Sequence, residues 1–415
     1  LASEVGIWDY GEDEVIEKGR VGPGEMLAID TYTGKLFSST DIDNELKERH
    51  PYRDWLTKNV RRLVPFDELE ANQIGQRTFS DKEMAQYHKM FNYSYEEIHQ
   101  VVKTLSENGQ EATGSMGDDT PMAVLSSQPR TLYDYFRQQF AQVTNPPIDP
   151  LRERYVMSLG TCIGREHNVF SETSGHADRL LFSTPVLMHT GLKQLRELDP
   201  EHYRSDTLTL NYDPEEGLEA AIKRLCDESE DLVRNKNTVI LVLSDRQINP
   251  GLLVVPAAMA VGAVHKRLVD QQLRCDSNII VETASVRDSH QYAVLLGLGA
   301  TAIYPYLAFE TIEQLVEQGQ IKLSSRDAIV NYREGINKGL LKILSKMGIS
   351  TIASYRCAGL FEVIGLNDNI MKLCFSDLPS RIQGADFGDI EQDNINLARK
   401  AFLPHQKMSH GGLLK

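Results

Sequence analysis

Ten side chains that can bind ligands or transfer protons lie at or just after the C-terminal ends of predicted strands. The strands are short runs rich in β-branched residues near positions 207, 239, 279, 302 and 351. Carboxylates, guanidinium groups and phenols at such positions can hold a phosphate or move a proton. The ten residues are Asn211, Asp213, Asp245, Arg246, Glu282, Thr283, Tyr304, Tyr306, Tyr355 and Arg356.

These strand-end residues allow two interpretations. In the first, the chain is an independent βα-barrel enzyme that acts on a small acidic or phosphorylated metabolite through Arg246, Glu282 and Arg356. In the second, these three residues and Asp245 pair with one another at the mouth of the sheet and have a structural role. The second interpretation is favoured, because oppositely charged side chains that lie close together often form ion pairs with one another. For the chain as a whole, a pure interaction module is a further alternative.

Other patterns that carry chemistry are weak in this sequence. None of the eleven histidines has HExxH or HxxxH spacing, and no serine lies in a GxSxG motif. The five cysteines lack CxxC spacing, so we expect reduced thiols and no metal cluster. Cys357 follows a predicted strand beside Arg356, and a buried thiol is the favoured interpretation over a reactive one. The sequence therefore assigns no catalytic, cofactor-binding or metal-binding residue.

The predicted strands define the fold class. They run without alternation of polar and apolar residues, which is typical of strands buried on both faces of a parallel sheet. Segments of helical length separate them, as parallel neighbours require. The GLGA run at 297–300 follows a helix and precedes a strand, so we expect Gly299 to end a helix and not to cradle a phosphate. The predicted class is α/β, with a partial barrel-like parallel sheet of βα units.

A helical lead-in and a small N-terminal β unit precede this sheet. Residues 1–45 contain two short predicted strands joined by glycine turns. Ser80 with Glu83 and Ser94 with Glu97 have the spacing of capping boxes at helix starts. We expect a helix over 131–142 and another that Asp213 caps ahead of Pro214.

Composition excludes several functional classes. The net charge of −15 over 415 residues disfavours general binding to nucleic acid or to an anionic membrane. No uninterrupted apolar run has the roughly 18 residues that a membrane span needs. We therefore expect a cytoplasmic protein without nucleic-acid or membrane partners. The chain begins at Leu1 without a signal-peptide pattern, and we interpret it as a piece of a larger protein.

Several long strings resemble the large (alpha) chain of bacterial glutamate synthase. They are FAQVTNPPIDPLRE, IIVETASVRDSHQYAVLLGLGATAIYPYLAFETI and NYREGINKGLLKILSKMGISTIASYRCAGLFEVIGL, all of which are similar to its central domain. The opening LASEVG and KGRVGPGEMLAIDTYTGKL resemble the end of the class II glutaminase domain. The resemblance runs essentially from one end of the chain to the other.

The resemblance implies a parent enzyme that makes two glutamates from glutamine, 2-oxoglutarate and reductant. It implies that this fragment carries no cofactor, whereas the parent uses FMN and an iron–sulfur cluster. The implied partners are the glutaminase and FMN-binding synthase domains of the same chain, and an NADPH-dependent small subunit. The isolated fragment is expected to be inactive, because none of the family's catalytic residues can be placed on it.

The resemblance also suggests a domain division and a role in ammonia channelling. We expect 1–45 to be the remnant of the glutaminase domain, 46–130 a helical connector and 131–415 the central domain. The prolines of VTNPPIDP stiffen the backbone. Thr144 and Asn145 in that segment are the candidates for lining part of the ammonia tunnel, and a structural turn is the alternative.

Overall fold

The computed structural model describes residues 4, 6–64, 77–114, 121–139, 148–149 and 151–412. The chain forms two compact units, Leu1–Asn59 and Val60–Lys415, which are described separately. Among the described residues, no helix is both long and apolar enough to cross a membrane.

The first unit is a short hairpin followed by two helices. Strands β1 (Ala28–Asp30) and β2 (Lys35–Phe37) pair antiparallel, as the sequence predicts. Helices α1 (Ser39–Arg49) and α2 (Tyr52–Asn59) follow, and the one-turn η1 (Glu12–Glu14) precedes the hairpin. None of the described residues of this unit is buried. The unit therefore has no apolar core of its own.

A four-stranded parallel sheet forms the centre of the second unit. Its strand order is β12-β11-β9-β7, and every neighbouring pair is parallel. An isolated bridge from Val186 to Ile303 continues the sheet beside β12. The sheet is open, so the prediction of a partial barrel-like α/β fold is confirmed. The strands are β7 (Ser205–Thr209), β9 (Ile240–Ser244), β11 (Asn278–Glu282) and β12 (Ala302–Tyr304).

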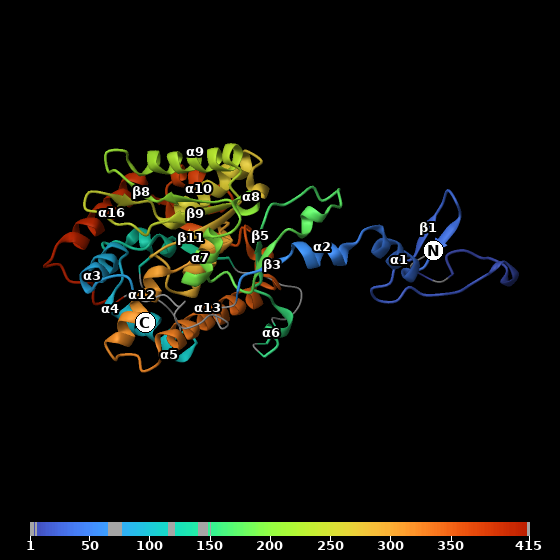
Figure 1. The fold of residues 1–415 in the computed structure, drawn as a ribbon, viewed down its shortest axis with the longest axis horizontal. Helices are drawn as coiled ribbons and strands as arrows, with labels where there is room; N and C mark the ends of the chain where they lie inside the picture. Colours follow the sequence, from blue (N-terminus) through green and yellow to red (C-terminus); the bar gives the residue numbers. More distant parts are fainter. Residues whose placement is uncertain are drawn as a thin grey trace. The chain divides into compact units, whose positions relative to one another are not determined.

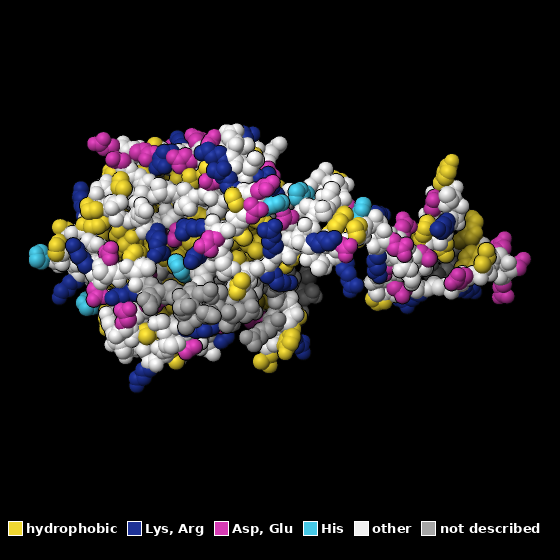
Figure 2. Space-filling view, viewed as in Figure 1, with side chains coloured by type: hydrophobic (Ala, Val, Ile, Leu, Met, Phe, Trp, Pro, Cys, Tyr) yellow, Lys and Arg dark blue, Asp and Glu magenta, His cyan; other side chains and the backbone are white. Residues whose placement is uncertain are grey.

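Helices alternate with these strands and bury them. In Figure 1, α9 and α10 lie above the strands and α12 and α13 lie below them. Strands β9, β11 and β12 are buried at every position, which explains why their sequences lack alternation. Figure 2 shows acidic and basic side chains interspersed over α9 on the outer surface. The helices are α9 (Leu218–Lys236), α10 (Ala257–Asp270), α11 (Ser289–Gly297), α12 (Tyr306–Glu317) and α13 (Ser325–Met347).

The fifth predicted strand is wrong. The Thr351 side chain accepts a hydrogen bond from the Ser354 N–H and starts the one-turn helix α14 (Ile352–Tyr355) instead. The next strand, β13 (Phe361–Leu366), belongs to a separate sheet of order β14-β13-β4. There β13 pairs parallel with β14 (Ser380–Ala385) and antiparallel with β4 (Phe136–Gln138).

The helical lead-in begins as predicted. Ser80 and Ser94 both form capping boxes, with Glu83 and Glu97 respectively. These boxes start α3 (Asp81–Met90) and α4 (Tyr95–Glu97), which continues through the π-helical η4 (Ile98–Val102) into α5 (Lys103–Asn108). Gly109 ends α5 with a φ of 59°.

Two predicted helices differ from the structure. The segment from 131 forms the single turn η6 (Leu132–Tyr135) and then strand β4, because β13 offers it a strand partner. Asp213 does not cap a helix, since its carboxylate accepts the Glu215 N–H in a turn and α9 begins only at Leu218. Gly299 lies one residue after Leu298, the C-cap of α11, with a φ of 117°.

The remaining elements are short, apart from α7, α15 and α16. Strands β3 (Arg61–Arg62), β6 (Leu180–Phe182) and β5 (Thr161–Ile163) form a third sheet, and β8 (Asn211–Tyr212) pairs with β10 (Leu253–Val254). The other helices are η5 (Ala123–Leu125), α6 (Glu153–Val156), η7 (Ser174–Ala177), α7 (His189–Arg196), α8 (Pro200–Tyr203), η8 (Arg274–Asp276), α15 (Asp368–Cys374) and α16 (Phe387–Phe402).

Candidate functional site

Arg246 occupies the centre of the C-terminal edge of the parallel sheet, two residues after β9. Its guanidinium nitrogens lie 3.6 Å from Glu282 Oε1 and 3.7 Å from Glu310 Oε1. The guanidinium also lies over the ring of Tyr306, 4.9 Å from its centroid. The structure thus brings together the predicted residues Arg246, Glu282 and Tyr306.

Both carboxylates have further donors within the chain. Glu282 accepts hydrogen bonds from Arg196 Nη2 and Ser244 Oγ, each at 2.8 Å. Glu310 accepts from the Thr78 backbone N–H at 2.8 Å and from its hydroxyl at 2.5 Å. These contacts compensate the buried charges, as burial of a carboxylate requires. The cluster therefore joins β9 and β11 to α7, to α12 and to residues just before α3.

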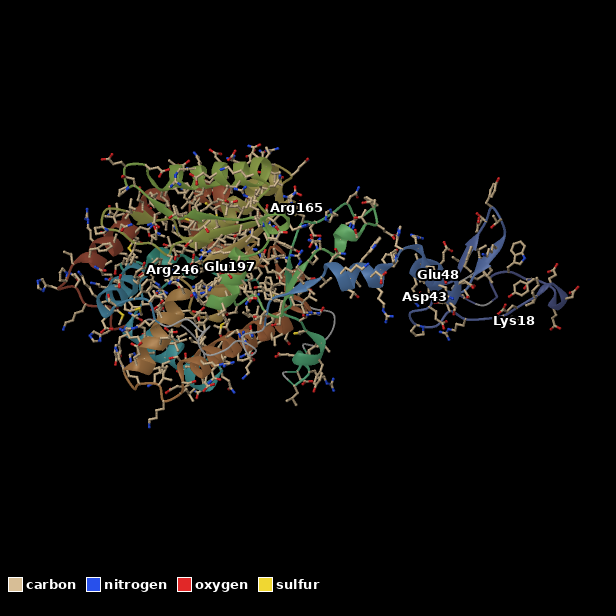
Figure 3. The ribbon with its side chains drawn as sticks, in the orientation of Figure 1. Lys18, Asp43, Glu48, Arg165, Glu197 and Arg246 are labelled. Atoms are coloured by element: carbon tan, nitrogen blue, oxygen red, sulfur yellow. The ribbon has the colours of Figure 1, made fainter. Side chains whose placement is uncertain are left out.

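Two cavities flank Arg246. In Figure 3, Arg246 and Glu197 lie near each other on one face of the second unit. Both border a cavity of about 320 Å³ together with His189, Leu192, Lys193, Arg196 and Glu282. A second cavity of about 370 Å³ has Arg246 on the other side, beside Phe79, Tyr87, Gln247, Ile248 and Asn249. Burial, followed by the charge of Arg246, lowers the pKa of His189, which favours its neutral imidazole.

Asp245 faces the interior and ends a chain of hydroxyl groups. Its side chain is 1% exposed, and its two oxygens accept the Ala284 N–H at 2.9 Å and the Thr283 hydroxyl at 2.5 Å. The Thr283 hydroxyl lies 2.8 Å from Ser285 Oγ, which lies 2.8 Å from the Tyr133 hydroxyl. Burial raises the pKa of Asp245 to about 7, although these hydrogen bonds act in the opposite direction.

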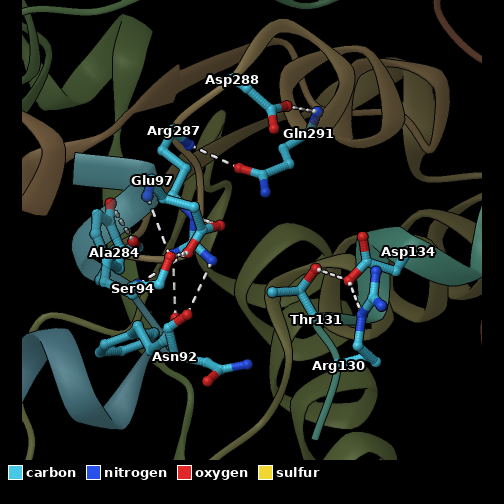
Figure 4. A network of polar contacts seen from close by, with 12 residues as sticks. Asn92, Ser94, Glu97, Arg130, Thr131, Asp134, Ala284, Arg287, Asp288 and Gln291 are labelled. Atoms are coloured by element: carbon cyan, nitrogen blue, oxygen red, sulfur yellow. Dashed lines mark hydrogen bonds and ion pairs between the residues drawn. The ribbon is translucent and has the colours of Figure 1, made fainter. Parts of the chain in front are cut away.

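Arg287 connects the loop after β11 to the helical lead-in (Figure 4). Its side chain is 1% exposed and lies 4.1 Å from the ring centroid of Tyr93. Its guanidinium donates to Glu97 Oε1 at 2.9 Å and to the carbonyl oxygens of Phe91 at 3.1 Å and Asn92 at 3.3 Å. We call this set of contacts the Arg287 clamp. The Tyr93 hydroxyl also donates to the Ala284 carbonyl at 3.1 Å, so the clamp holds the loop that contains Thr283 and Ser285.

Several predicted strand-end residues lie elsewhere. Arg356 donates to Thr301 Oγ1 at 3.2 Å, and Thr301 precedes β12, so Arg356 lies at the opposite end of the sheet from Arg246 and Glu282. The predicted three-residue site of an independent enzyme is therefore wrong, as is the expectation that Arg356 pairs at the mouth. Tyr355 lies in α14, where its hydroxyl accepts from Gln138. Two others lie close to Arg246: Asn211 donates to the carbonyl of Gln247, the next residue, and Tyr304 Oη lies 3.4 Å from Nδ1 of His189, which borders the same cavity as Arg246.

The cysteines and metal ligands give no separate centre in the described part of the chain. All five cysteines are free thiols. The expectation of a buried thiol at Cys357 is wrong, since the residue is exposed; it has a φ of 58°, and its sulfur, the more sheltered part, lies 3.9 Å from His265 Nδ1. Burial raises the pKa of Cys357, which favours the protonated thiol. Within the described ranges, no three histidine, cysteine or acidic side chains are grouped as a metal ion would require.

Thr144 and Asn145, the candidates for lining the ammonia tunnel, lie outside the described residues. The chain is held on both sides of them. The Gln139 N–H donates to the Leu360 carbonyl at 2.8 Å, directly after β4. The Ile148 carbonyl accepts from Ser345 Oγ on α13, also at 2.8 Å.

Sequence reasoning missed the partners that complete these clusters. Arg196 and Glu310 bind strand-end charges from helices, and Arg287 lies in a loop that no motif marks. Only Glu97 had a local signal, its capping box with Ser94, and that signal does not indicate a second role in binding Arg287. Contacts between residues distant in the sequence require the tertiary structure.

Comparison with known proteins gives a consistent result. The family described as "Glutamate synthase central domain" matches residues 86–367, and "Glutamine amidotransferases class-II" matches residues 1–55. The chain is 38% identical to a chloroplastic ferredoxin-dependent glutamate synthase of Oryza sativa subsp. japonica, covering 97% of this chain and 25% of that protein. It is 36% identical to a glutamate synthase [NADH] of Schizosaccharomyces pombe, covering 98% of this chain and 20% of that protein. It is 34% identical to the glutamate synthase [NADPH] large chain of Bacillus subtilis, covering 97% of this chain and 26% of that protein. The chain thus spans about a quarter or less of the length of these relatives.

Proposed function

The chain belongs to the glutamate synthase central-domain family, and from that premise we propose that its own role is structural. It would hold a glutaminase domain and a flavin-binding synthase domain of one long chain in register, and it would border part of the path that ammonia takes between them. The proposed division is 1–45 as glutaminase remnant, 46–130 as connector and 131–415 as central domain.

The parent protein's activity is part of the proposal. We propose that it converts glutamine, 2-oxoglutarate and reductant into two glutamates in the cytoplasm. FMN and an iron–sulfur cluster would bind to regions of the parent outside this chain. An NADPH-dependent small subunit is the proposed electron source, as the name of the Bacillus subtilis relative suggests. Other relatives carry ferredoxin or NADH in their names, so the donor must be tested directly.

The compensated charge cluster at the strand ends carries the structural role. A catalytic sheet edge would be expected to direct its charged groups at a substrate. Here Arg246 lies between two carboxylates that have additional donors of their own, from Arg196 and Thr78. These contacts stabilise the joint between the sheet and its lead-in. The Arg287 clamp serves the same purpose on the neighbouring loop.

The ammonia path is proposed to pass Thr144 and Asn145. The described residues on either side of this segment are hydrogen-bonded: the Gln139 N–H donates to Leu360, directly before β13, and the Ile148 carbonyl accepts from Ser345 on α13. Ammonia is small and neutral, so a closed route with polar liners would keep it from water and protons. The segment's prolines restrict the directions in which Asn145 can point.

The experiment is Asn145→Leu in the complete enzyme, with Asn235→Leu on the exposed surface of α9 as the matched control. We expect glutamine hydrolysis to continue while free ammonia per glutamate formed rises above that of the control. The assay measures both products in one reaction, together with the melting temperature. Unchanged ammonia release with a lowered melting temperature would reject the tunnel role and leave Asn145 as a structural residue.

A further inference from the structure

The cavity of about 320 Å³ beside Arg246 has three basic side chains on its wall. Lys193 and Arg196 come from one face of α7, and Arg246 comes from the loop after β9. Among the described residues that border the cavity, the acidic ones are Glu197, labelled with Arg246 in Figure 3, and Glu282. Three basic and two acidic side chains give the wall a net charge of +1, in a chain whose net charge is −15.

The guanidinium of Arg246 retains N–H donors for a ligand. Its nitrogens lie 3.6 Å from Glu282 and 3.7 Å from Glu310, which are ion-pair distances but exceed the length of a hydrogen bond. Its described hydrogen bond runs from Nη2 to Thr78 Oγ1 at 3.2 Å, and Tyr304 lies beside it. A guanidinium carries more donors than these partners accept. The two ion pairs therefore fix the position of the group without satisfying all of its N–H bonds.

Arg196 also has donors to spare. Its Nη2 donates to Glu282 at 2.8 Å, while its Nε and Nη1 have no hydrogen-bond acceptor among the described residues. The side chain is 42% exposed, so its donors can be reached from solvent. Arg196 and Arg246 both contact Glu282, which places the two guanidinium groups beside each other. One carboxylate is thus shared by two arginines on the wall of an accessible space.

The same wall offers apolar surface. Leu192 borders the cavity next to Lys193, and the long basic side chains contribute alkyl stems of their own. A ligand with an anionic group and a short apolar part would therefore find partners for both. The basic residues would repel a cation, and an inorganic anion would gain nothing from Leu192. Because Lys193 is 65% exposed, the cavity is open on its side and does not fix the length of the ligand.

We propose that this cavity binds a small organic carboxylate. The carboxylate oxygens would accept hydrogen bonds from Arg196 and Arg246, since a guanidinium matches a carboxylate in shape and charge. Lys193 would add attraction at longer range, and the alkyl part would contact Leu192. One negative charge on the ligand neutralises the net charge of the wall. The site goes beyond the structural role proposed above and does not depend on it, because it uses donors that the ion pairs leave open.

The test is a titration of the full chain with three probes, monitored by NMR of the Leu192 methyl groups and the His189 ring. Butyrate is the organic carboxylate, butyramide has the same shape without the charge, and inorganic phosphate is an anion without an alkyl part. We expect butyrate to bind with a dissociation constant roughly tenfold lower than that of butyramide, since hydrogen bonds between charged groups contribute that much. Equal affinity of butyrate and butyramide, tighter binding of phosphate, or no shift with any probe would overturn the proposal.

A variant of Arg196 locates the interaction. Arg196→Gln removes one guanidinium but keeps a donor for Glu282, so we expect the preference for butyrate over butyramide to fall at least about threefold. Arg234→Gln is the matched control, because Arg234 on α9 donates to Glu230 at 3.0 Å and is 45% exposed, close to the values for Arg196. We expect the control to leave butyrate affinity unchanged. Equal weakening in both variants would reduce the effect to general attraction by positive charge and refute the site.

A second variant keeps the test independent of folding. Lys193 makes only a 3.9 Å contact with Glu197 in the described structure, so Lys193→Gln is not expected to disturb the fold. We expect it to weaken butyrate binding about twofold to threefold, the contribution of an exposed charge, and to leave butyramide binding unchanged. Dispersed methyl spectra confirm folding of each variant. Unchanged butyrate affinity in Lys193→Gln would refute the site even if Arg196→Gln failed to fold.

Discussion

Replacement of Arg287 by methionine tests whether the Arg287 clamp holds the lead-in on the sheet. Removal of one partner from a buried ion pair costs about 3–5 kcal/mol of unfolding free energy, because the other charge stays buried. Glu97 is the residue left behind. Its side chain is 20% exposed, and it keeps its hydrogen bonds from the Ser94 N–H and hydroxyl, both at 2.9 Å. The expected loss of unfolding free energy in Arg287→Met is therefore at the lower end of that range, about 3 kcal/mol.

The assay is urea unfolding followed by circular dichroism at helix wavelengths. Tryptophan fluorescence is unsuitable, because both tryptophans, Trp8 and Trp55, lie in the first unit. Arg234→Met is the matched control. Arg234 pairs with Glu230 at 3.0 Å on the surface of α9 with 45% of its side chain exposed, so its loss is expected to cost less than about 1 kcal/mol.

A double variant separates the ion pair from the other contacts of the arginine. Glu97→Gln retains the capping box with Ser94, since glutamine serves at this position as well as glutamate. If the pair acts as described, the loss in Arg287→Met/Glu97→Gln will be smaller than the sum of the two single losses by about 1–3 kcal/mol. A loss below about 1 kcal/mol in Arg287→Met, or strict additivity in the double variant, would refute the reasoning.

Three further predictions concern buried groups. Burial raises the pKa of Asp245 from 3.8 to about 7, so the folded chain binds more protons than the unfolded chain between these pH values. The unfolding free energy of the wild type therefore falls as pH rises through this range. Relative to the wild type, the unfolding free energy of Asp245→Asn should increase by up to about 1.4 kcal/mol per pH unit between pH 5 and 7. Urea titrations at several pH values measure this, and a difference that stays constant with pH would contradict it. Burial and then the charge of Glu310 raise the pKa of Glu313 to about 8, so the carboxylate is ionised at a cost in stability at pH 9. Glu313→Gln should therefore raise the melting temperature at pH 9 more than at pH 6. Equal changes at the two pH values would contradict the raised pKa of Glu313. Gly262→Ala should cost about 1–3 kcal/mol in urea unfolding, because a Cβ would lie 2.1 Å from the Cys374 carbonyl oxygen, whereas a neutral effect would show that α10 and α15 separate easily.

The parts of the fold that depend on local sequence were predictable. The runs that became β9 and β11 are buried on both faces, so their lack of alternation indicated a parallel sheet correctly. The capping boxes of Ser80 and Ser94 involve residues only three positions apart, so the local sequence was enough to predict them. Arg246 and Glu282 were predictable as neighbours, since strand ends of a parallel sheet lie along one edge.

The errors arose where distant or competing contacts decide the structure. The apolar spacing after Thr131 fits a helix, yet pairing with β13 makes residues 136–138 a strand. At Thr351 a single parallel bridge to Ser158 is followed at once by a capped helical turn, so a run of strand-forming residues ends as a helix. Because that turn moves Arg356 to the other end of the sheet, the error in secondary structure became an error in the predicted site.

The parallel sheet and the sheet of β14, β13 and β4 differ in when they can assemble during synthesis. In the parallel sheet, each strand pairs with the strand of this sheet that comes next before or after it in the chain, so pairing can proceed as each βα unit leaves the ribosome. Strand β4 has to wait, because its partner β13 is made only after the whole parallel sheet and α13. Until then its backbone groups are unpaired and available to other strands. The segment that contains Thr144 and Asn145 therefore acquires its attachment at Gln139 only late in synthesis, when Leu360 emerges.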